Sequence, residues 1–234
     1  MNITQSIPLD QKWTNSTLSI KSIKRIAPNG KNSALWADHK SNSVYSWGGD
    51  APYPDTIAKG ADNKNLWAFT PDGKGGGSWA SRAANNPAVF LGIRRGAYGI
   101  SASCNGVGFV LGGRANPYTD SSLRSEISMP GLIMYNMGSG NWENRTATGN
   151  YETAMAGEAM CLPFGPNGLV MFLGGAFSSL TDPYQLSPIN FNNVTFYDPV
   201  ANIWYSQTTT GSQPDQRQYF CSTGVAGPNG TFEM

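Results

Sequence analysis

Hydrophobic and polar positions along this chain recur with a long period. Three apolar runs each end in a pair of glycines, and the successive pairs lie 64 and 62 residues apart. A tryptophan follows each pair about 30 residues later. The runs are Val44–Trp47 before Gly48 and Gly49, Phe109–Leu111 before Gly112 and Gly113, and Val170–Leu173 before Gly174 and Gly175, and the tryptophans are Trp79, Trp142 and Trp204. Such a spacing predicts an internal repeat.

Each repeat contains the apolar patterns of four short strands. A strand of small residues comes first, then the apolar run, an aromatic strand and a strand carrying the tryptophan. The small-residue strands are Ala97–Cys104 and Ala154–Cys161, and the aromatic strands are Leu66–Phe69, Leu132–Tyr135 and Val194–Tyr197. Turn residues such as Pro71-Asp72-Gly73 separate the last two strands. Four antiparallel strands per repeat predict a β-propeller blade.

The repeat divides the chain into one propeller segment of about three and a half blades, an incomplete ring. The predicted units are 31–82, 83–148 and 149–210, with 211–234 as the start of a fourth blade. Residues 1–30 are predicted to hold ring-closing strands, because Leu9–Trp13 imitates the outer half of a blade with nothing before it. Closure would protect strand edges that otherwise attract other chains.

Composition agrees with an all-β chain. Charged residues make up only 13% of the 234 residues, while 28 glycines and 15 prolines supply turns between short strands. The net charge of +1 and the lack of a basic stripe argue against nucleic-acid binding. No apolar run approaches the roughly 18 residues of a membrane span, and residues 1–6 do not read as a secretory leader.

The segment after each double glycine is long, polar and irregular. The three segments are Asp50–Lys64, Arg114–Pro130 and Ala176–Asn190. Long loops in a compact domain are usually functional, so these are predicted to form the binding surface.

The three cysteines lie 57 and 60 residues apart, close to the repeat length. No Cys-x-x-Cys spacing supports zinc or redox chemistry. We expect Cys104, Cys161 and Cys221 to be small buried hydrophobic residues. A disulfide between neighbouring blades is the alternative in an oxidising compartment.

Candidate catalytic groups are scarce. A catalytic triad or a histidine-based metal site would have to rest on the single histidine, His39, which falls in a predicted hairpin turn and is expected to be a surface residue. Glu158 lies in a small-residue strand and is expected to be a solvated carboxylate of the central channel. Arg94, Arg95 and Arg217 precede such strands and are expected to bind loop carbonyls. We therefore predict no catalytic, cofactor-binding or metal-binding residue.

These motifs resemble the kelch repeat, in which a double glycine, an aromatic turn and a tryptophan follow one another. Tyr197 and Asp198 before Trp204 match it fully, Tyr135 before Trp142 has Asn136 in place of aspartate, and Phe69 before Trp79 carries a glycine insertion. Leu9–Trp13 and Leu35–Asp38 are similar to segments of fungal extracellular or membrane-anchored kelch proteins.

The resemblance implies a non-enzymatic interaction scaffold, secreted or at the cell surface, with protein or cell-wall glycan partners. Kelch propellers have six or seven blades, so the chain is expected to be a piece of a longer protein. Two alternatives stay open: the N-terminal part of a galactose-oxidase-like copper oxidase whose catalytic residues are missing from this chain, and an intracellular kelch polarity scaffold. Glycosylation of at least one Asn-x-Ser/Thr sequon is expected, the candidates being Asn2, Asn15, Asn144, Asn193 and Asn229.

Overall fold

The computed structural model describes residues 26–27, 30–51, 65–74, 76–165 and 168–234 of the chain. The predicted outer hairpin at Leu9–Trp13 and the sequons at Asn2 and Asn15 lie outside the described residues. So does most of the polar segment that follows the first double glycine.

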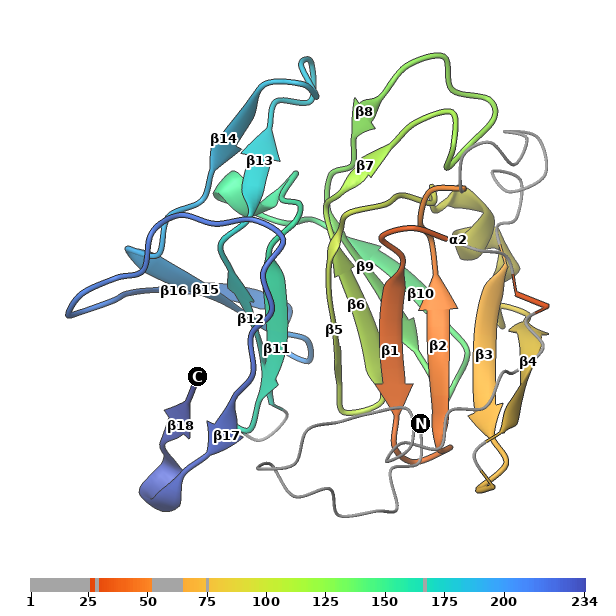
Figure 1. The fold of residues 1–234 in the computed structure, drawn as a ribbon, viewed down its shortest axis with the longest axis horizontal. Helices are drawn as coiled ribbons and strands as arrows, with labels where there is room; N and C mark the ends of the chain where they lie inside the picture. Colours follow the sequence, from red (N-terminus) through yellow and green to blue (C-terminus); the bar gives the residue numbers. More distant parts are fainter. Residues whose placement is uncertain (1–25, 28–29, 52–64, 75, 166–167) are drawn as a thin grey trace, which may run out of the picture.

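Three four-stranded antiparallel sheets dominate the structure (Figure 1), and we call them blades 1, 2 and 3. Blade 1 consists of β1 (Ala34–Asp38), β2 (Ser43–Trp47), β3 (Leu66–Pro71) and β4 (Gly77–Arg82). Blade 2 consists of β5 (Ile100–Cys104), β6 (Val107–Leu111), β9 (Leu132–Asn136) and β10 (Trp142–Arg145). Blade 3 consists of β11 (Glu158–Leu162), β12 (Leu169–Leu173), β15 (Asn193–Asp198) and β16 (Ile203–Thr208). The predicted all-β class is confirmed, and the strands pair in sequence order within each blade.

The first strands of the three blades lie side by side, β1 beside β5 and β5 beside β11. These inner strands begin later than the sequence predicts. The expected strands start at Ala97 and Ala154, whereas β5 starts at Ile100 and β11 at Glu158. The reason is a left-handed backbone at Tyr98 and Ala156, with φ of 64° and 56°, which a strand cannot contain.

Two small hairpins stand at one end of the blades, which we call the upper end (Figure 1). They consist of β7 (Arg114–Ala115) with β8 (Ile127–Ser128), and β13 (Ala176–Ser178) with β14 (Leu186–Pro188). The segments after the second and third double glycines were expected to be irregular and are instead partly paired. Proline and serine near their tips leave only short runs able to pair.

The C-terminal part departs from the predicted fourth copy. Residues 217–224 contain no strand, although the sequence predicts one from Arg217 to Cys221. A strand needs a partner with which to pair its backbone groups, and β17 (Val225–Ala226) pairs only with β18 (Phe232–Glu233). The remaining elements are the helix α2 (Pro87–Gly92) and the 3₁₀ turns η1 (Gly149–Tyr151) and η2 (Pro228–Gly230).

The hydrophobic core lies between the blades. Trp36 of β1 is fully buried, and its indole N–H donates to the Phe109 carbonyl of β6 at 3.1 Å. A side chain at Gly108 would overlap the Trp36 ring, so this glycine admits the indole into blade 2. Between blades 2 and 3, Phe109 and Leu132 pack with Phe172.

The expectation that the cysteines are small buried hydrophobic residues was wrong: two of the three are paired, and the third is exposed. Cys104 of β5 and Cys161 of β11 form a disulfide that joins the inner strands of blades 2 and 3. The alternative of an inter-blade disulfide is therefore the one that the structure contains. Cys221 is exposed and free.

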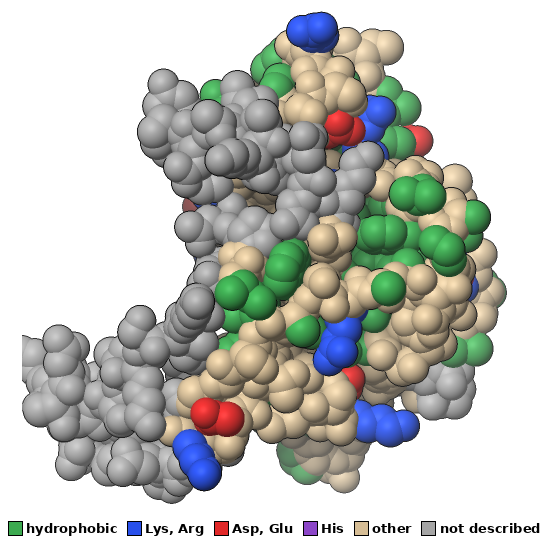
Figure 2. Space-filling view, turned by 90° about the vertical axis from the view of Figure 1, so that its right-hand side faces the viewer, with side chains coloured by type: hydrophobic (Ala, Val, Ile, Leu, Met, Phe, Trp, Pro, Cys, Tyr) green, Lys and Arg blue, Asp and Glu red, His purple; other side chains and the backbone are tan. Residues whose placement is uncertain are grey.

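The side of the molecule where α2 and β4 lie carries scattered charges and one gathering of hydrophobic side chains (Figure 2). The exposed hydrophobic residues of α2 are Val89 and Leu91. No helix among the described residues is long and apolar enough to cross a membrane.

Candidate functional site

Four residues have left-handed backbone at equivalent positions of the repeat, three of them just before the inner strands β1, β5 and β11. Asn32, Tyr98, Ala156 and Tyr219 all have φ between 54° and 64°. Each backbone N–H donates to the carbonyl of the residue before it in this series: Tyr98 to Asn32 at 3.2 Å, Ala156 to Tyr98 at 2.9 Å and Tyr219 to Ala156 at 2.8 Å. We call this chain of hydrogen bonds the axial ladder. It includes Tyr219, so it runs past blade 3 into the C-terminal segment.

The double glycines make a second set of ties between neighbours. The second glycine of each pair donates its N–H to a carbonyl two residues before the next member of the ladder. Gly49 donates to Gly96 at 2.8 Å, Gly113 to Ala154 at 2.8 Å and Gly175 to Arg217 at 3.0 Å. Each double glycine therefore fastens its own blade to the segment that follows.

Backbone geometry explains why glycine occupies these positions. All six glycines have positive φ, between 53° and 94°. This region of backbone conformation favours glycine. A side chain at Gly112 would overlap the carbonyl of Ala154, and one at Gly113 would lie 2.6 Å from that of Ala97.

A pocket of about 160 Å³ opens beside the axial ladder. Its lining comes from the entries to the three inner strands and from the C-terminal segment, and consists of Asn32, Ser33, Tyr98, Gly99, Ala156, Gly157, Glu158, Tyr219 and Phe220. The pocket therefore lies at the upper end of the inner strands. The sequence drew attention only to Glu158 among these residues.

Glu158 is the one carboxylate in this lining, and it is partly buried at the start of β11. Burial raises the pKa of Glu158, while a hydrogen bond from the backbone of Ala159 lowers it. Glu158 was expected to be a solvated carboxylate of the central channel. It lies in the pocket lining, but its side chain is half-buried rather than fully solvated.

A charged cluster forms the rim between the pocket and the hairpin β7–β8. The Arg114 guanidinium lies over the Tyr98 ring at 4.3 Å and pairs with Glu126 at 2.9 Å. Asp50 accepts a hydrogen bond from the Asn116 side-chain amide at 3.2 Å. Burial raises the pKa of Asp50, and this hydrogen bond lowers it.

Arg95 has the structural role expected for it. Its side chain is only 6% exposed, and its guanidinium donates to the Thr119 carbonyl at 2.9 and 3.2 Å. Arg94 instead pairs with Asp120 at 3.7 Å, and the Arg217 side chain donates to the Asp215 carbonyl. Only Arg95 therefore holds a loop carbonyl of the upper end from a buried position.

The aromatic residues of the repeat form the same cross-strand pair in each blade. Tyr197 faces Trp204 and Tyr135 faces Trp142, each with ring centroids 4.7 Å apart, and in blade 1 Trp79 faces Phe69 at 5.3 Å. Trp142 is fully buried, whereas Trp79 and Trp204 are partly exposed. These residues lie on the outer strands and contribute nothing to the pocket lining.

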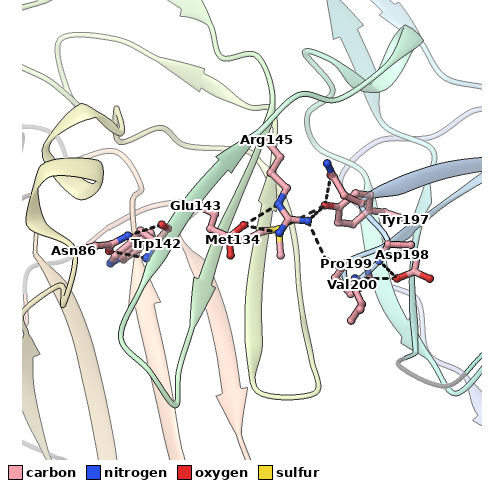
Figure 3. A network of polar contacts seen from close by, with 11 residues as sticks. Asn86, Met134, Trp142, Glu143, Arg145, Tyr197, Asp198, Pro199 and Val200 are labelled. Atoms are coloured by element: carbon pink, nitrogen blue, oxygen red, sulfur yellow. Dashed lines mark hydrogen bonds and ion pairs between the residues drawn. The ribbon is translucent and has the colours of Figure 1, made fainter.

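Tyr197 also joins blade 3 to blade 2 (Figure 3). Arg145 of β10 donates to the Tyr197 hydroxyl at 2.7 Å and to the Pro199 carbonyl at 3.0 Å, while Glu143 pairs with the same guanidinium. Asp198, the aspartate of the predicted motif, accepts the backbone N–H groups of Val200 and Ala201 at 2.8 and 2.9 Å. Asp198 thereby shapes the turn, and Asn136 does the same for Gly138 and Ser139 in blade 2.

The three described sequons are exposed. Asn229 lies in the turn η2. Asn144 lies within β10, because the tryptophan strand continues to Arg145. Asn193 is the first residue of β15.

The remaining candidates stay apart from the pocket. His39 lies in the turn between β1 and β2 and is exposed. No group of three or more His, Cys, Asp or Glu residues that could hold a metal ion occurs in the described ranges.

Comparison with known proteins supports the architecture. No protein-family model and no curated protein matches the chain. Among solved structures, the β-propeller YjhT is similar with a TM-score of 0.50, at 15% sequence identity, over 79% of this chain and 53% of YjhT. The chain thus spans about half the length of YjhT. At this identity the likeness concerns the fold alone, and it confirms the predicted β-propeller fold.

Proposed function

We propose that this chain is a non-enzymatic binding scaffold of the kelch type, secreted or displayed at a cell surface, which holds a protein or cell-wall glycan partner on its upper end. The kelch assignment rests on the double glycines, aromatic turns and tryptophans of the three repeats. The extracellular setting is supported by the inter-blade disulfide, because disulfides persist in oxidising compartments.

One observation carries the binding role: the two upper hairpins are tied together into a continuous surface. The hydroxyls of Ser128 in β8 and Ser178 in β13 are hydrogen-bonded at 2.7 Å, and Ser128 also donates to the Ser179 carbonyl at 3.0 Å. Thr153, just before the axial ladder, donates to the Ser178 carbonyl. Segments held in place by a rigid scaffold are suited to binding.

The tip of the hairpin β13–β14 offers the exposed contact residue. Tyr184 lies between these strands with 70% of its surface exposed. Tyrosine supplies a large contact area at a low cost in conformational entropy. Exposed Leu180 at the same tip adds apolar surface.

Sedimentation with insoluble cell-wall glycans, and cross-linking on intact cell surfaces followed by purification of the partner, would test this proposal. We expect Tyr184→Ala to weaken retention of the identified partner roughly tenfold, which corresponds to about 1.4 kcal/mol and is in the range of a contact residue that contributes to binding without dominating it. The matched control is Tyr205→Ala on the outer strand β16, where the side chain is 47% exposed. Equal retention of both variants, or no retention of any glycan or surface protein, would contradict the proposal.

A further inference from the structure

No ion pair joins Glu158 to a cationic side chain in the part of the chain that the structure describes. The ion pairs among the described residues use Asp120, Glu126 and Glu143 as their acidic members. Burying part of a carboxylate without a counter-charge costs free energy. A ligand that brings a positive charge would recover that cost.

Aromatic rings flank the same pocket. Tyr98 and Tyr219 meet edge to face with ring centroids 6.1 Å apart, and both belong to the lining. The Tyr98 ring already accepts the Arg114 guanidinium at 4.3 Å on one face. Tyr219 is 65% exposed, so its ring is accessible from solvent. Tyrosine faces attract cations through their quadrupole.

From these contacts we propose that the axial pocket binds a primary ammonium group, with the Glu158 carboxylate as its charge partner and Tyr219 as its aromatic wall. Asn32 and Ser33 belong to the same lining, and an amide oxygen and a hydroxyl are side-chain groups that can accept N–H groups. An ammonium offers three donors on a compact head, which suits a pocket of about 160 Å³.

Charge separates this ligand from the other classes that an upper-end pocket could take. An anionic group would meet the unpaired Glu158 carboxylate and be repelled. A neutral hydroxyl could donate to the carboxylate but would leave its charge uncompensated. The ammonium can come from a lysine side chain of a partner protein or from a free aliphatic amine. The inference rests on the proposed function, because it names one contact that a partner on the upper end would make.

Calorimetric titration of the full chain with small amines tests the site. The probes are Nα-acetyl-lysine amide as the lysine side chain, 1,5-diaminopentane as the free amine, and Nα-acetyl-norleucine amide as the uncharged analogue. We expect one or both amines to bind with a Kd on the order of 1 mM, at least tenfold tighter than the uncharged analogue, as for an isolated charge-assisted contact. If only one of the two amines binds, it shows whether the ammonium of the ligand belongs to a lysine side chain or to a free aliphatic amine.

Variants separate the site from the fold. Glu158→Gln should weaken amine binding at least tenfold without lowering the thermal unfolding midpoint, and Tyr205→Ala should bind as the wild type does. Binding should also weaken as the pH falls and the carboxylate becomes protonated. No ionisable or charged residue besides Glu158, Tyr98 and Tyr219 lines the pocket, and Arg114 with Glu126 lies behind Tyr98.

Three results would overturn the inference: no binding of either amine, equal binding by Glu158→Gln, or equal binding of the uncharged analogue. Its failure is distinguishable from failure of the proposed function. If Tyr184→Ala weakens retention of the partner while the wild type binds neither amine, the scaffold role stands and the ammonium site is refuted. If the amines bind through Glu158 and no glycan or surface protein is retained, the reverse holds.

Discussion

The axial ladder is built from residues that ordinarily avoid its backbone conformation. A non-glycine residue in the left-handed region costs roughly 1 kcal/mol or more, and Tyr98, Ala156 and Tyr219 all adopt it. The conformation turns each N–H toward the preceding member of the ladder. Strain at these residues is thus compensated by hydrogen bonds between blades, at the place where the pocket opens.

Gly112 is required for two reasons, its positive φ and the lack of space next to the Ala154 carbonyl, and substitutions can separate the two. Gly112→Val should lower the free energy of unfolding by more than about 3 kcal/mol, because a side chain would overlap the Ala154 carbonyl in addition to the strain of positive φ. Gly106→Ala is the control, since Gly106 has φ of 78° but open space around it, and it should cost only about 1 kcal/mol. Denaturant unfolding measures both, and equal losses would refute the overlap argument.

Glu158 gives a prediction with a pH dependence. Its pKa is raised by burial, so the folded state disfavours the ionised form. The stability associated with its protonated form is present below the ordinary glutamate pKa and is lost as the pH rises through the raised pKa. Glu158→Gln should therefore be more stable than wild type at pH 7, by less than about 1 kcal/mol because the side chain is partly exposed.

The comparison is urea unfolding at neutral pH and at about pH 3.5, where the difference should vanish because the wild-type carboxyl is protonated. Glu152→Gln is the control, because Glu152 is exposed directly after η1, and the change should not alter stability measurably. A variant that is less stable than wild type at neutral pH would show that burial does not disfavour the Glu158 carboxylate.

At the scale of the elements, the indole ring of Trp36 in blade 1 packs against strand β6 of blade 2. The Trp36 ring fills the space that Gly108 leaves on β6 and donates to the Phe109 carbonyl. Aromatic side chains bury large areas and dominate such contacts. The contact of β1 with β6 therefore depends on a large residue on one strand and the smallest possible residue on the other.

Coupling between these two residues can be measured with a double-mutant cycle. Gly108→Ala should destabilise the protein by about 1–3 kcal/mol, since overpacking forces the indole to move. Made in a Trp36→Leu background, the same change should cost less than about 0.5 kcal/mol because the ring is gone. Chemical denaturation of the four proteins gives the coupling energy. Additive losses would mean that Gly108 does not make room for Trp36.

The strands were predictable from sequence because their signals are local. Apolar runs, turn residues and the distance from Gly112 to Trp142 indicate four strands and their order. The hairpin β7–β8 was not predicted from the sequence because each of its strands is only two residues long. The axial ladder and most of the pocket were not predicted because a tyrosine or an alanine in the sequence does not indicate a positive φ. Only Asn32 in the ladder is of a type enriched there.

For the molecule as a whole, the disulfide adds a covalent link between blades 2 and 3 to the one that the main chain provides. Cys104 and Cys161 are separated by 57 residues in sequence and joined across the inner strands. Their pairing could not be derived from the period alone. The repeat brings all three cysteines to similar positions, and only packing of β5 on β11 distinguishes the pair from Cys221.

Replacing both Cys104 and Cys161 by alanine should lower stability by roughly 4 kcal/mol, as the chain-entropy account gives for a loop of this length. Thermal unfolding with and without reductant measures the loss in wild type, and the alanine variant should not respond to reductant. Thiol titration of the denatured chain is the independent check: one free thiol, that of Cys221, before reduction and three after it. Three thiols before reduction would contradict the pairing.

The ties that fasten each double glycine to the next segment use backbone atoms alone. The N–H of Gly113 and the carbonyl of Ala154 would be present whatever side chains the two blades carried. A gene encoding such a chain can therefore duplicate, lose or replace a whole repeat, and the joint forms again wherever two glycines meet a correctly turned backbone. These backbone hydrogen bonds do not depend on the side chains of the upper hairpins. The hairpin sequences can therefore vary, and partner specificity with them, while the blades stay fastened to one another.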